Sequence, residues 1–497
     1  MDLSSFAVVL SIFAGGVGAL ILVLKRINGW RYERGLGEKR LQLPPGDMGW
    51  PFIGNMFAFL RAFKTGNPDS FIGSFVKRFE RIGIYKTFMF GSPTILVTVP
   101  ETCRQVLMDE HNFIPGWPKA TWELIGRKSF VGLSYDEHKR IRRLTAAPVN
   151  GHEALSNYIG FIEASVVSAL EKWAQIGEIE FLTEIRRLTF RIITYIFLSS
   201  GGDPVMEALE KEYTLLNHGV RAMAINIPGF AYYRALKARK RLVVILQSVL
   251  NDRRKKKGAG TTSKKKDMMD ELIEVEDEQG RRLTDEEIID ILVMYLNAGH
   301  ESSAHITMWA TVFLQKHPEF LQKAKAEQEE ILRNRPATQK GLSLKETRQM
   351  EFISKVIDET LRVVNISSVV FREATEDVTI NGYIIPKGWK VQVWFRNVHL
   401  DPEVYPDPKE FNPSRWDGLT PKAGAFIPFG AGSRLCPGND LAKLEISIFL
   451  HYFLLGYELK RANPNCRVRY LPHPRPKDNC KAMVIKLPVL PAANKAE

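Results

Sequence analysis

The sequence predicts a mainly α-helical fold with small β-sheets, on the basis of three observations. A helical stretch of more than 30 residues, 285–317, follows Thr284 and Glu287, which form a capping box in which each side chain bonds to the other residue's backbone N–H. Two hairpin patterns, 84–98 and 378–393, lie far apart in the chain, and the second has an Asn-Gly turn. Strands do not alternate with helices, which argues against a Rossmann fold or a β/α barrel.

The first residues of the chain predict a membrane anchor. Residues 3–24 carry no charged side chain, and as a helix they would be about 33 Å long, close to the ~30 Å hydrocarbon core of a bilayer. Basic residues follow the apolar run; they are Lys25, Arg26, Arg31, Arg34, Lys39 and Arg40. This order is typical of a signal anchor, 1–24, that crosses the membrane once and leaves the bulk of the chain in the cytosol.

The structure of the remaining segments is predicted from proline and glycine positions and from hydrophobic periodicity. The basic, proline-rich segment 25–55 is expected to be a stiff hinge, and 56–497 a single catalytic domain. Residues 100–250 have a mostly helical pattern, and the stretches 345–364 and 439–455 are each expected to form one helix. The basic stretch 253–266 is expected to be an exposed, mobile loop.

Composition narrows the classes of partner. Lys and Arg number 69 and Asp and Glu 56, which gives a net charge of +13 and suits nucleic acid, an anionic membrane or an acidic protein. The chain has no zinc-finger spacing and no RNP-like motif, so we expect no nucleic acid. With 45% hydrophobic and 25% charged residues, it is neither disordered nor a multi-span membrane protein. Four cysteines without a CxxC pair are typical of a reducing compartment.

The segment 429–438, FGAGSRLCPG, carries the strongest chemical motif. Its three glycines and its proline favour a tight turn whose backbone can lie close to a flat ligand. Cys436 stands at the tip of the turn just before a helix, where amide N–H groups and the helix N-terminus would stabilise a thiolate. Arg434 can pair with an anionic group beside the sulfur. A thiolate on a rigid loop is what an axial iron ligand requires, so we expect Cys436 to bind iron.

The spacing F-x-x-G-x-R-x-C-x-G of this segment, which contains Phe429, Gly430, Arg434 and Cys436, resembles the haem-binding loop of the cytochrome P-450 family, the haem-thiolate monooxygenases. The resemblance covers essentially the whole chain. It implies the cytochrome P-450 fold, heme b with its iron ligated by Cys436, and dioxygen as co-substrate. Because the chain has no nicotinamide-binding fingerprint, the electrons would come from NADPH through a separate reductase.

Two further motifs of the family have counterparts at the expected places. Glu359 and Arg362 resemble its E-x-x-R motif, whose two charges share one helix face, and Arg415 occupies the place of its later arginine. The resemblance implies a Glu359–Arg362–Arg415 network behind the haem loop.

The hexapeptide AGHESS, 298–303, is similar to the oxygen-activating segment of the family, which lies in the middle of the long helix. The small Ala298 would leave room for dioxygen. Glu301 and a hydroxyl would deliver protons. The family commonly has threonine where this chain has Ser302, so either Ser302 or Ser303 is the relay hydroxyl.

Three residues match positions that hold haem propionates in the family. Arg142 and Arg372 are expected to pair with these carboxylates. His138 replaces a tryptophan, and its interpretation as a propionate ligand stands beside that of a solvated surface histidine. The basic run 139–143 is either a docking face for the reductase or a solvated face next to the propionates.

The finer resemblance is to a plant branch of the family, the ent-kaurenoic acid oxidases, which act in gibberellin synthesis at the endoplasmic reticulum membrane. Segments such as 126–155, 421–454 and 471–480 are similar to that branch. The expected substrate pocket contains Ala298, Ala304, Asn365, Ser367, Ser368 and Val369. Ala304 and the stretch 365–370 depart from the branch. Three hypotheses remain: oxidation of ent-kaurenoic acid, oxidation of a triterpenoid skeleton, and a haem-binding membrane protein without turnover.

Overall fold

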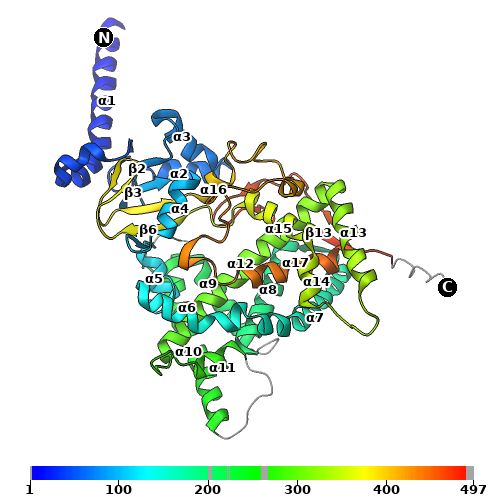
Figure 1. The fold of residues 1–497 in the computed structure, drawn as a ribbon. Coiled ribbons are helices and arrows are strands. Elements are labelled where there is room, and N and C mark those ends of the chain that lie inside the picture. Colours follow the sequence, from blue (N-terminus) through cyan, green and yellow to red (C-terminus); the bar gives the residue numbers. More distant parts are fainter. Residues whose placement is uncertain (1–2, 200–203, 221, 223, 259–266, 489–497) are drawn as a thin grey trace. The chain divides into compact units, whose positions relative to one another are not determined.

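The computed structural model describes residues 3–199, 204–220, 222, 224–258 and 267–488 (Figure 1). These residues form two compact units. Unit 1 contains the described residues within 1–116, 367–404 and 422–427, and unit 2 contains those within 117–366, 405–421 and 428–497.

Unit 1 is built on a six-stranded sheet with the order β1-β2-β3-β9-β6-β4. Its strands are β1 (Gly46–Asp47), β2 (Ile84–Met89), β3 (Ser92–Val97), β4 (Phe113–Pro115), β6 (Val370–Ala374) and β9 (Lys390–Val393), with a separate pair β7 (Val378–Ile380) and β8 (Tyr383–Ile385). Its helices after the first are α2 (Met56–Lys64), α3 (Asp69–Phe79), α4 (Pro100–Met108) and α16 (Phe395–His399).

Both predicted hairpins are present, and both use left-handed residues in the turn. Phe90 and Gly91 join β2 to β3 with φ angles of 52° and 80°, and Asn381 and Gly382 join β7 to β8 with 51° and 79°. Such turns match the right-handed twist of paired strands. The second hairpin is shorter than predicted, because residues 390–393 leave it and pair with β3 and β6 instead.

The anchor helix α1 (Leu3–Glu33) extends from the sheet of unit 1 (Figure 1) and leads into a 3-10 segment, η1 (Arg34–Gln42). It is long and apolar enough to cross a membrane, with a mean hydropathy of 1.8 in its apolar window. Buried Asn28 fastens it to the following loop: its amide nitrogen donates to the carbonyls of Met48 (3.0 Å) and Trp50 (2.6 Å), and its carbonyl accepts the Phe52 N–H. The predicted hinge is therefore helical at its start and tied to α1 near its end.

Unit 2 is mainly helical. Its helices are α5 (Lys119–Ile125), α6 (Tyr135–Asn150), α7 (His152–Ile176), α8 (Phe181–Leu198), α9 (Pro204–Val220), α10 (Ala231–Gly258), α11 (Met268–Glu274), α12 (Asp285–Lys316), α13 (Pro318–Asn334), α14 (Leu344–Gln349), α15 (Glu351–Val364) and α17 (Asn439–Gly456), with short 3-10 segments η2 (Pro413–Asp417) and η3 (Gly432–Arg434). Its strands are β5 (Glu178–Glu180), β10 (Tyr457–Arg461), β11 (Val468–Arg469), β12 (Arg475–Pro476) and β13 (Lys481–Lys486).

The long helix α12 starts where the capping box predicted. The Thr284 hydroxyl accepts the Glu287 N–H, and the Glu287 carboxylate accepts the Thr284 N–H at 2.8 Å. Most of the helix is buried, and it runs through unit 2 between α8 and α17 (Figure 1).

Two expected segments differ from the prediction. The stretch 345–364 is two helices, because α14 ends at Gln349 and a carboxylate, that of Glu327, accepts the Phe352 and Ile353 N–H groups at the start of α15. The stretch 253–266 begins as helix: α10 continues to Gly258, and Arg253 pairs with two carboxylates at 2.7 and 2.8 Å. The rest of that stretch, 259–266, lies outside the described residues.

Candidate active site

The cysteine loop is a closed turn between two positive-φ glycines and the start of α17. The Cys436 N–H donates to the Phe429 carbonyl at 2.9 Å, which closes the turn. Gly430 and Gly432 have φ angles of 83° and 72°, a conformation that side-chain-bearing residues rarely adopt. A Cβ on Gly430 would meet nothing closer than 4.0 Å, so this glycine is needed for its backbone angle and leaves open space at the loop surface.

Two predicted arginines fix this loop to the rest of unit 2. Arg434 donates to the carbonyls of Phe130 and Leu133, both at 3.2 Å, and Arg142 on α6 donates to the Leu435 carbonyl at 2.6 Å. The two residues that directly precede Cys436 are therefore held by charge-assisted hydrogen bonds.

His138 does not lie on the surface. Its ring is 3% exposed and packs edge-on against Phe130 with centroids 5.3 Å apart. The interpretation as a solvated histidine is wrong. The backbone carbonyl of Phe130 accepts a hydrogen bond from Arg434. His138 therefore packs against the segment to which the cysteine loop is attached.

The Cys436 thiol has the exposure and the donors that an iron ligand needs. The residue is partly accessible to solvent. Burial by the surrounding protein raises the pKa of the thiol, while the Gly438 N–H and the charge of Arg142 act to lower it. The donors expected from the sequence are thus present, but alone they do not outweigh burial. A bound metal ion would, because its charge deprotonates a coordinating thiol. This soft, accessible ligand on a fixed loop fits a haem iron.

The open face of α12 carries Ala298 and Ser302. Ala298 is exposed, Ser302 is half-buried, and the Ser302 hydroxyl donates to the Ala298 carbonyl at 3.1 Å. Ser303 faces away: it is 2% exposed, donates to the Gly299 carbonyl at 3.0 Å, and interacts with the buried carboxyl of Glu445 on α17. The two candidate relay hydroxyls are therefore on different sides of the helix.

Two other residues of this segment are packed against protein. A Cβ on Gly299 would come within 3.1 Å of the Ile193 side chain on α8, so this glycine allows close helix packing. Ala304 has no exposed surface and lies roughly 120° around the helix from Ala298. The structure thus does not bring Ala304 to the open face.

The carboxylate of Glu301 is held in an ion pair that the sequence did not reveal. It is 6% exposed, pairs with Arg186 on α8, and accepts a hydrogen bond of 2.6 Å from the Asn217 amide on α9. Neither partner belongs to a motif. Each is separated from Glu301 by more than 80 residues, and only the packing of α8 and α9 against α12 brings them together.

The predicted Glu359–Arg362–Arg415 network is present and fully buried at its centre. Arg362 makes two hydrogen bonds of 2.8 Å to the Glu359 carboxylate, and Arg415 adds one of 3.1 Å. The sequence did not indicate two further donors, the Trp416 indole N–H and the Asn412 backbone N–H, at 3.1 and 3.0 Å. Every oxygen of this carboxylate therefore accepts at least two hydrogen bonds.

The remaining candidates are divided between the two units. Asn365 ends α15 in a left-handed conformation, and its amide donates to the Arg362 carbonyl at 2.5 Å. Unit 1 contains Arg372, Ser367, Ser368 and Val369. Arg372 is 6% exposed on β6. The Ser367 hydroxyl donates to the Val369 carbonyl at 3.4 Å.

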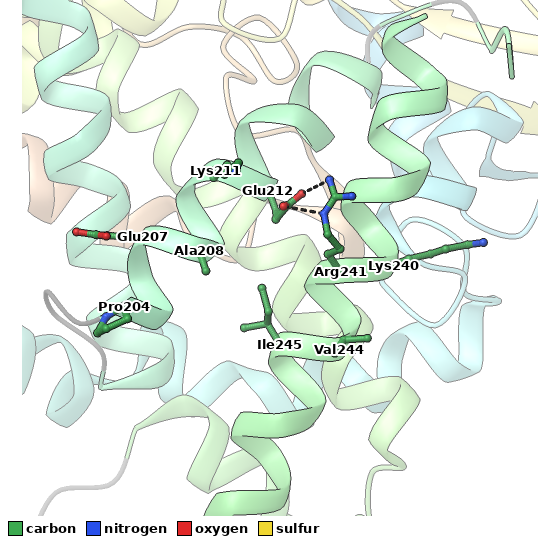
Figure 2. A pocket seen from close by; sticks show the side chains of 9 residues that line it. All are labelled: Pro204, Glu207, Ala208, Lys211, Glu212, Lys240, Arg241, Val244 and Ile245. Carbon is green, nitrogen blue, oxygen red and sulfur yellow. Dashed lines mark hydrogen bonds and ion pairs between the residues drawn. The ribbon is translucent and has the colours of Figure 1, made fainter. Parts of the chain in front are cut away.

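A separate surface groove runs between α9 and α10 (Figure 2). Glu212 and Arg241 face each other there and are joined by two hydrogen bonds of 2.7 Å, while Lys211 and Lys240 point away from this pair (Figure 2). The groove contains none of the residues of the cysteine loop or of the open face of α12. Its charged pair is satisfied within the protein, so we do not assign it to the active site.

A mainly helical fold and a partly accessible cysteine on an arginine-fixed, glycine-rich loop are what a haem-thiolate protein requires. The family model for cytochrome P-450 matches residues 44–472, and the chain belongs to this family. It is accordingly an oxidoreductase that carries a haem with a cysteine thiolate on the iron and uses dioxygen and electrons from a reductase.

Known proteins similar to this chain agree with that assignment. The chain is 66% identical to ent-kaurenoic acid oxidase 1 of Arabidopsis thaliana, over 94% of this chain and 96% of that protein. It is 55% identical to a 7,8-epoxymelianol synthase of Ailanthus altissima, over 98% of both. Among solved structures, the retinoic-acid-bound cyanobacterial CYP120A1 has a TM-score of 0.78 at 24% identity and covers 90% of this chain and 99% of its own. This last likeness confirms the predicted fold.

Proposed function

We propose that the chain oxidises ent-kaurenoic acid, a tetracyclic diterpene acid, and that Cys436 is its iron ligand. The observation that carries the chemistry is the accessible Cys436 thiol on a loop fixed by Arg142 and Arg434. The similarity to an ent-kaurenoic acid oxidase, which exceeds that to the epoxymelianol synthase, supports the substrate.

The haem, when bound, supplies oxygen activation and the oxidation of an unactivated C–H bond. The protein supplies orientation and protons. Ser302 is the better relay hydroxyl, since it lies on the open face of α12 while Ser303 is buried against α17. The carboxylate of Glu301, paired with Arg186, can pass a proton near that face.

The electron donor is expected to be an NADPH-dependent reductase on the endoplasmic reticulum membrane, with α1 as the anchor. The basic run on α6 presents less positive charge to a reductase than the sequence indicated, because two of its arginines pair with acidic residues of the chain itself. Arg140 pairs with Glu137 and Glu287 at 2.8 and 2.5 Å, and Arg143 pairs with an acidic residue as well. Lys139 is exposed and remains the best candidate contact in this run.

Product analysis with a reductase tests the substrate. The full-length chain should convert ent-kaurenoic acid and leave a protolimonoid-type triterpene largely unchanged. Conversion of the triterpene alone would replace this proposal with the triterpenoid hypothesis.

Replacement of the thiolate tests the ligand. Cys436→His should keep some haem but lose the red-shifted Soret band that thiolate ligation gives the ferrous carbon monoxide complex. Cys480→Ser, which removes a buried cysteine elsewhere in unit 2, is the control and should keep the band. A normal band in Cys436→His would exclude Cys436 as the ligand.

A further inference from the structure

Arg475 is brought to the flank of α12 by a small hairpin. It begins β12, which pairs antiparallel with β11 and places Arg469 opposite Arg475. The hairpin is fastened to α12, because the Trp309 indole N–H donates to the Pro474 carbonyl at 2.8 Å. Arg475 is therefore fixed in position beside the helix that carries Glu301.

Within the described part of the chain, the guanidinium of Arg475 contacts no group of opposite charge. It is half-buried, and among the residues that the structure describes it makes neither a hydrogen bond nor an ion pair through its side chain. Burial lowers its pKa, repulsion by Arg186 lowers it further, and attraction by Glu301 opposes this. The Glu301 carboxylate pairs with Arg186, so Arg475 adds a positive charge that no carboxylate of the described residues contacts.

A second donor in the same cluster lacks an acceptor. The Nε atom of Arg186 is buried and has no hydrogen-bond partner within the described part of the chain, although its Nη2 contacts Glu301. Buried donors and buried charges are costly unless they are paired. One carboxylate could satisfy both groups, since guanidinium and carboxylate match as planar, two-pronged partners.

This cluster borders the open face of α12. Counting 100° per residue, Glu301 lies within roughly 60° of Ala298 around the helix axis. The rings of His305, on the same flank, and His473, in the hairpin, have centroids 5.0 Å apart. An anionic group held at Arg475 would therefore leave the attached apolar skeleton beside Ala298 and Ser302.

We propose that Arg475, assisted by Arg186, binds the carboxylate of the substrate and orients its ring system along the open face of α12. This inference rests on the proposed function, because ent-kaurenoic acid carries such a carboxylate. It also predicts selection against neutral triterpenoids, since a site built for a polar group strongly rejects a ligand that lacks it.

The test compares ent-kaurenoic acid with its methyl ester, which lacks the charge and carries one additional methyl group. For each compound, the dissociation constant is measured from the substrate-induced shift of the Soret band in the full-length haem protein. The proteins are the wild type, Arg475→Gln, Arg475→Lys and the control Lys477→Gln, an exposed residue of the same segment. Carbon monoxide spectra establish that each variant carries intact haem.

The wild type and Lys477→Gln should bind the acid roughly 10- to 100-fold more tightly than the ester. Arg475→Gln should reduce this ratio to within a few-fold by weakening the acid alone, and Arg475→Lys should restore part of it. If the wild type converts ent-kaurenoic acid and Arg475→Gln keeps the full ratio, the inference is overturned and the proposed function stands. If the wild type neither binds nor converts the acid, the proposed function fails and the inference fails with it.

Discussion

Two buried clusters of unit 2 use the same residue types and differ in how completely they are satisfied. Around Glu359, two arginines, an indole and a backbone N–H converge on one carboxylate, and the spare donors of Arg362 reach the carbonyls of Pro408 and Glu410. Around Glu301, by contrast, the structure's described residues give Arg475 no counter-charge in contact and give the buried Nε atom of Arg186 no hydrogen-bond partner. A complete network serves the fold, while an incomplete one with surplus charge is suited to a ligand.

The largest effect is expected in the complete network. Arg362→Ala should cost about 3–5 kcal/mol, because it leaves the Glu359 carboxylate buried with one arginine instead of two. We expect little or no folded haem protein, measured as the yield of the carbon monoxide spectrum after expression. Arg415→Lys, which keeps a cation near the rim of the network, should be milder. Normal haem incorporation in Arg362→Ala would show that the network is dispensable.

A third buried carboxyl, Glu445 on α17, extends the comparison to a carboxyl that forms no ion pair among the described residues. Burial raises its pKa to about 8, and the Ser303 hydroxyl lowers it only in part. Below the usual pKa of about 4.5 both the folded and unfolded states are protonated, whereas between 4.5 and 8 the folded state alone keeps the proton. Stability is therefore lost as the pH rises through this window.

Glu445→Gln should remove that pH dependence. Relative to wild type, the variant should gain on the order of 3 kcal/mol in unfolding free energy between pH 5 and pH 8.5. Urea titrations of the haem absorbance at both pH values measure it. Parallel pH profiles for the two proteins would mean that Glu445 is ionised in the folded state.

Arg186→Gln should be less damaging than Arg362→Ala. The Glu301 carboxylate keeps its hydrogen bond from Asn217 and the attraction of Arg475, so we expect a loss of about 1–3 kcal/mol. The same urea titration measures it. A loss equal to that of Arg362→Ala would remove the distinction between the clusters.

The smallest effect, with the opposite sign, is expected at Arg475. Because Arg475→Gln deletes an uncompensated charge, it should leave stability unchanged or raise it by roughly 0.5–1 kcal/mol while acid binding weakens. Lys477→Gln should change neither quantity. A clear loss of stability in Arg475→Gln would indicate a structural role for this arginine.

The sequence predicted the features that depend on neighbouring residues or on a family motif. The capping box at Thr284, the Asn381-Gly382 turn and the Glu359–Arg362 pair each lie within a few residues, so their geometry follows from helix and turn periodicity. The sequence alone could not reveal the pairing of Glu301 with Arg186. These residues are 115 positions apart, and their contact depends on how the helices pack. The break at Met350 was missed for the same reason, since its cause is the distant Glu327.

The hydrogen bonds of Asn28 have a consequence for motion. Three hydrogen bonds join α1 to the loop Met48–Phe52. The helix and the rest of unit 1 therefore cannot rotate independently of each other. With α1 in a bilayer, any spin of the helix about its own axis has to carry the whole of unit 1 through the water beside the membrane. Rotational diffusion of the anchor is then set by the drag on that unit, and is slower than the spin of an isolated helix in the same lipid.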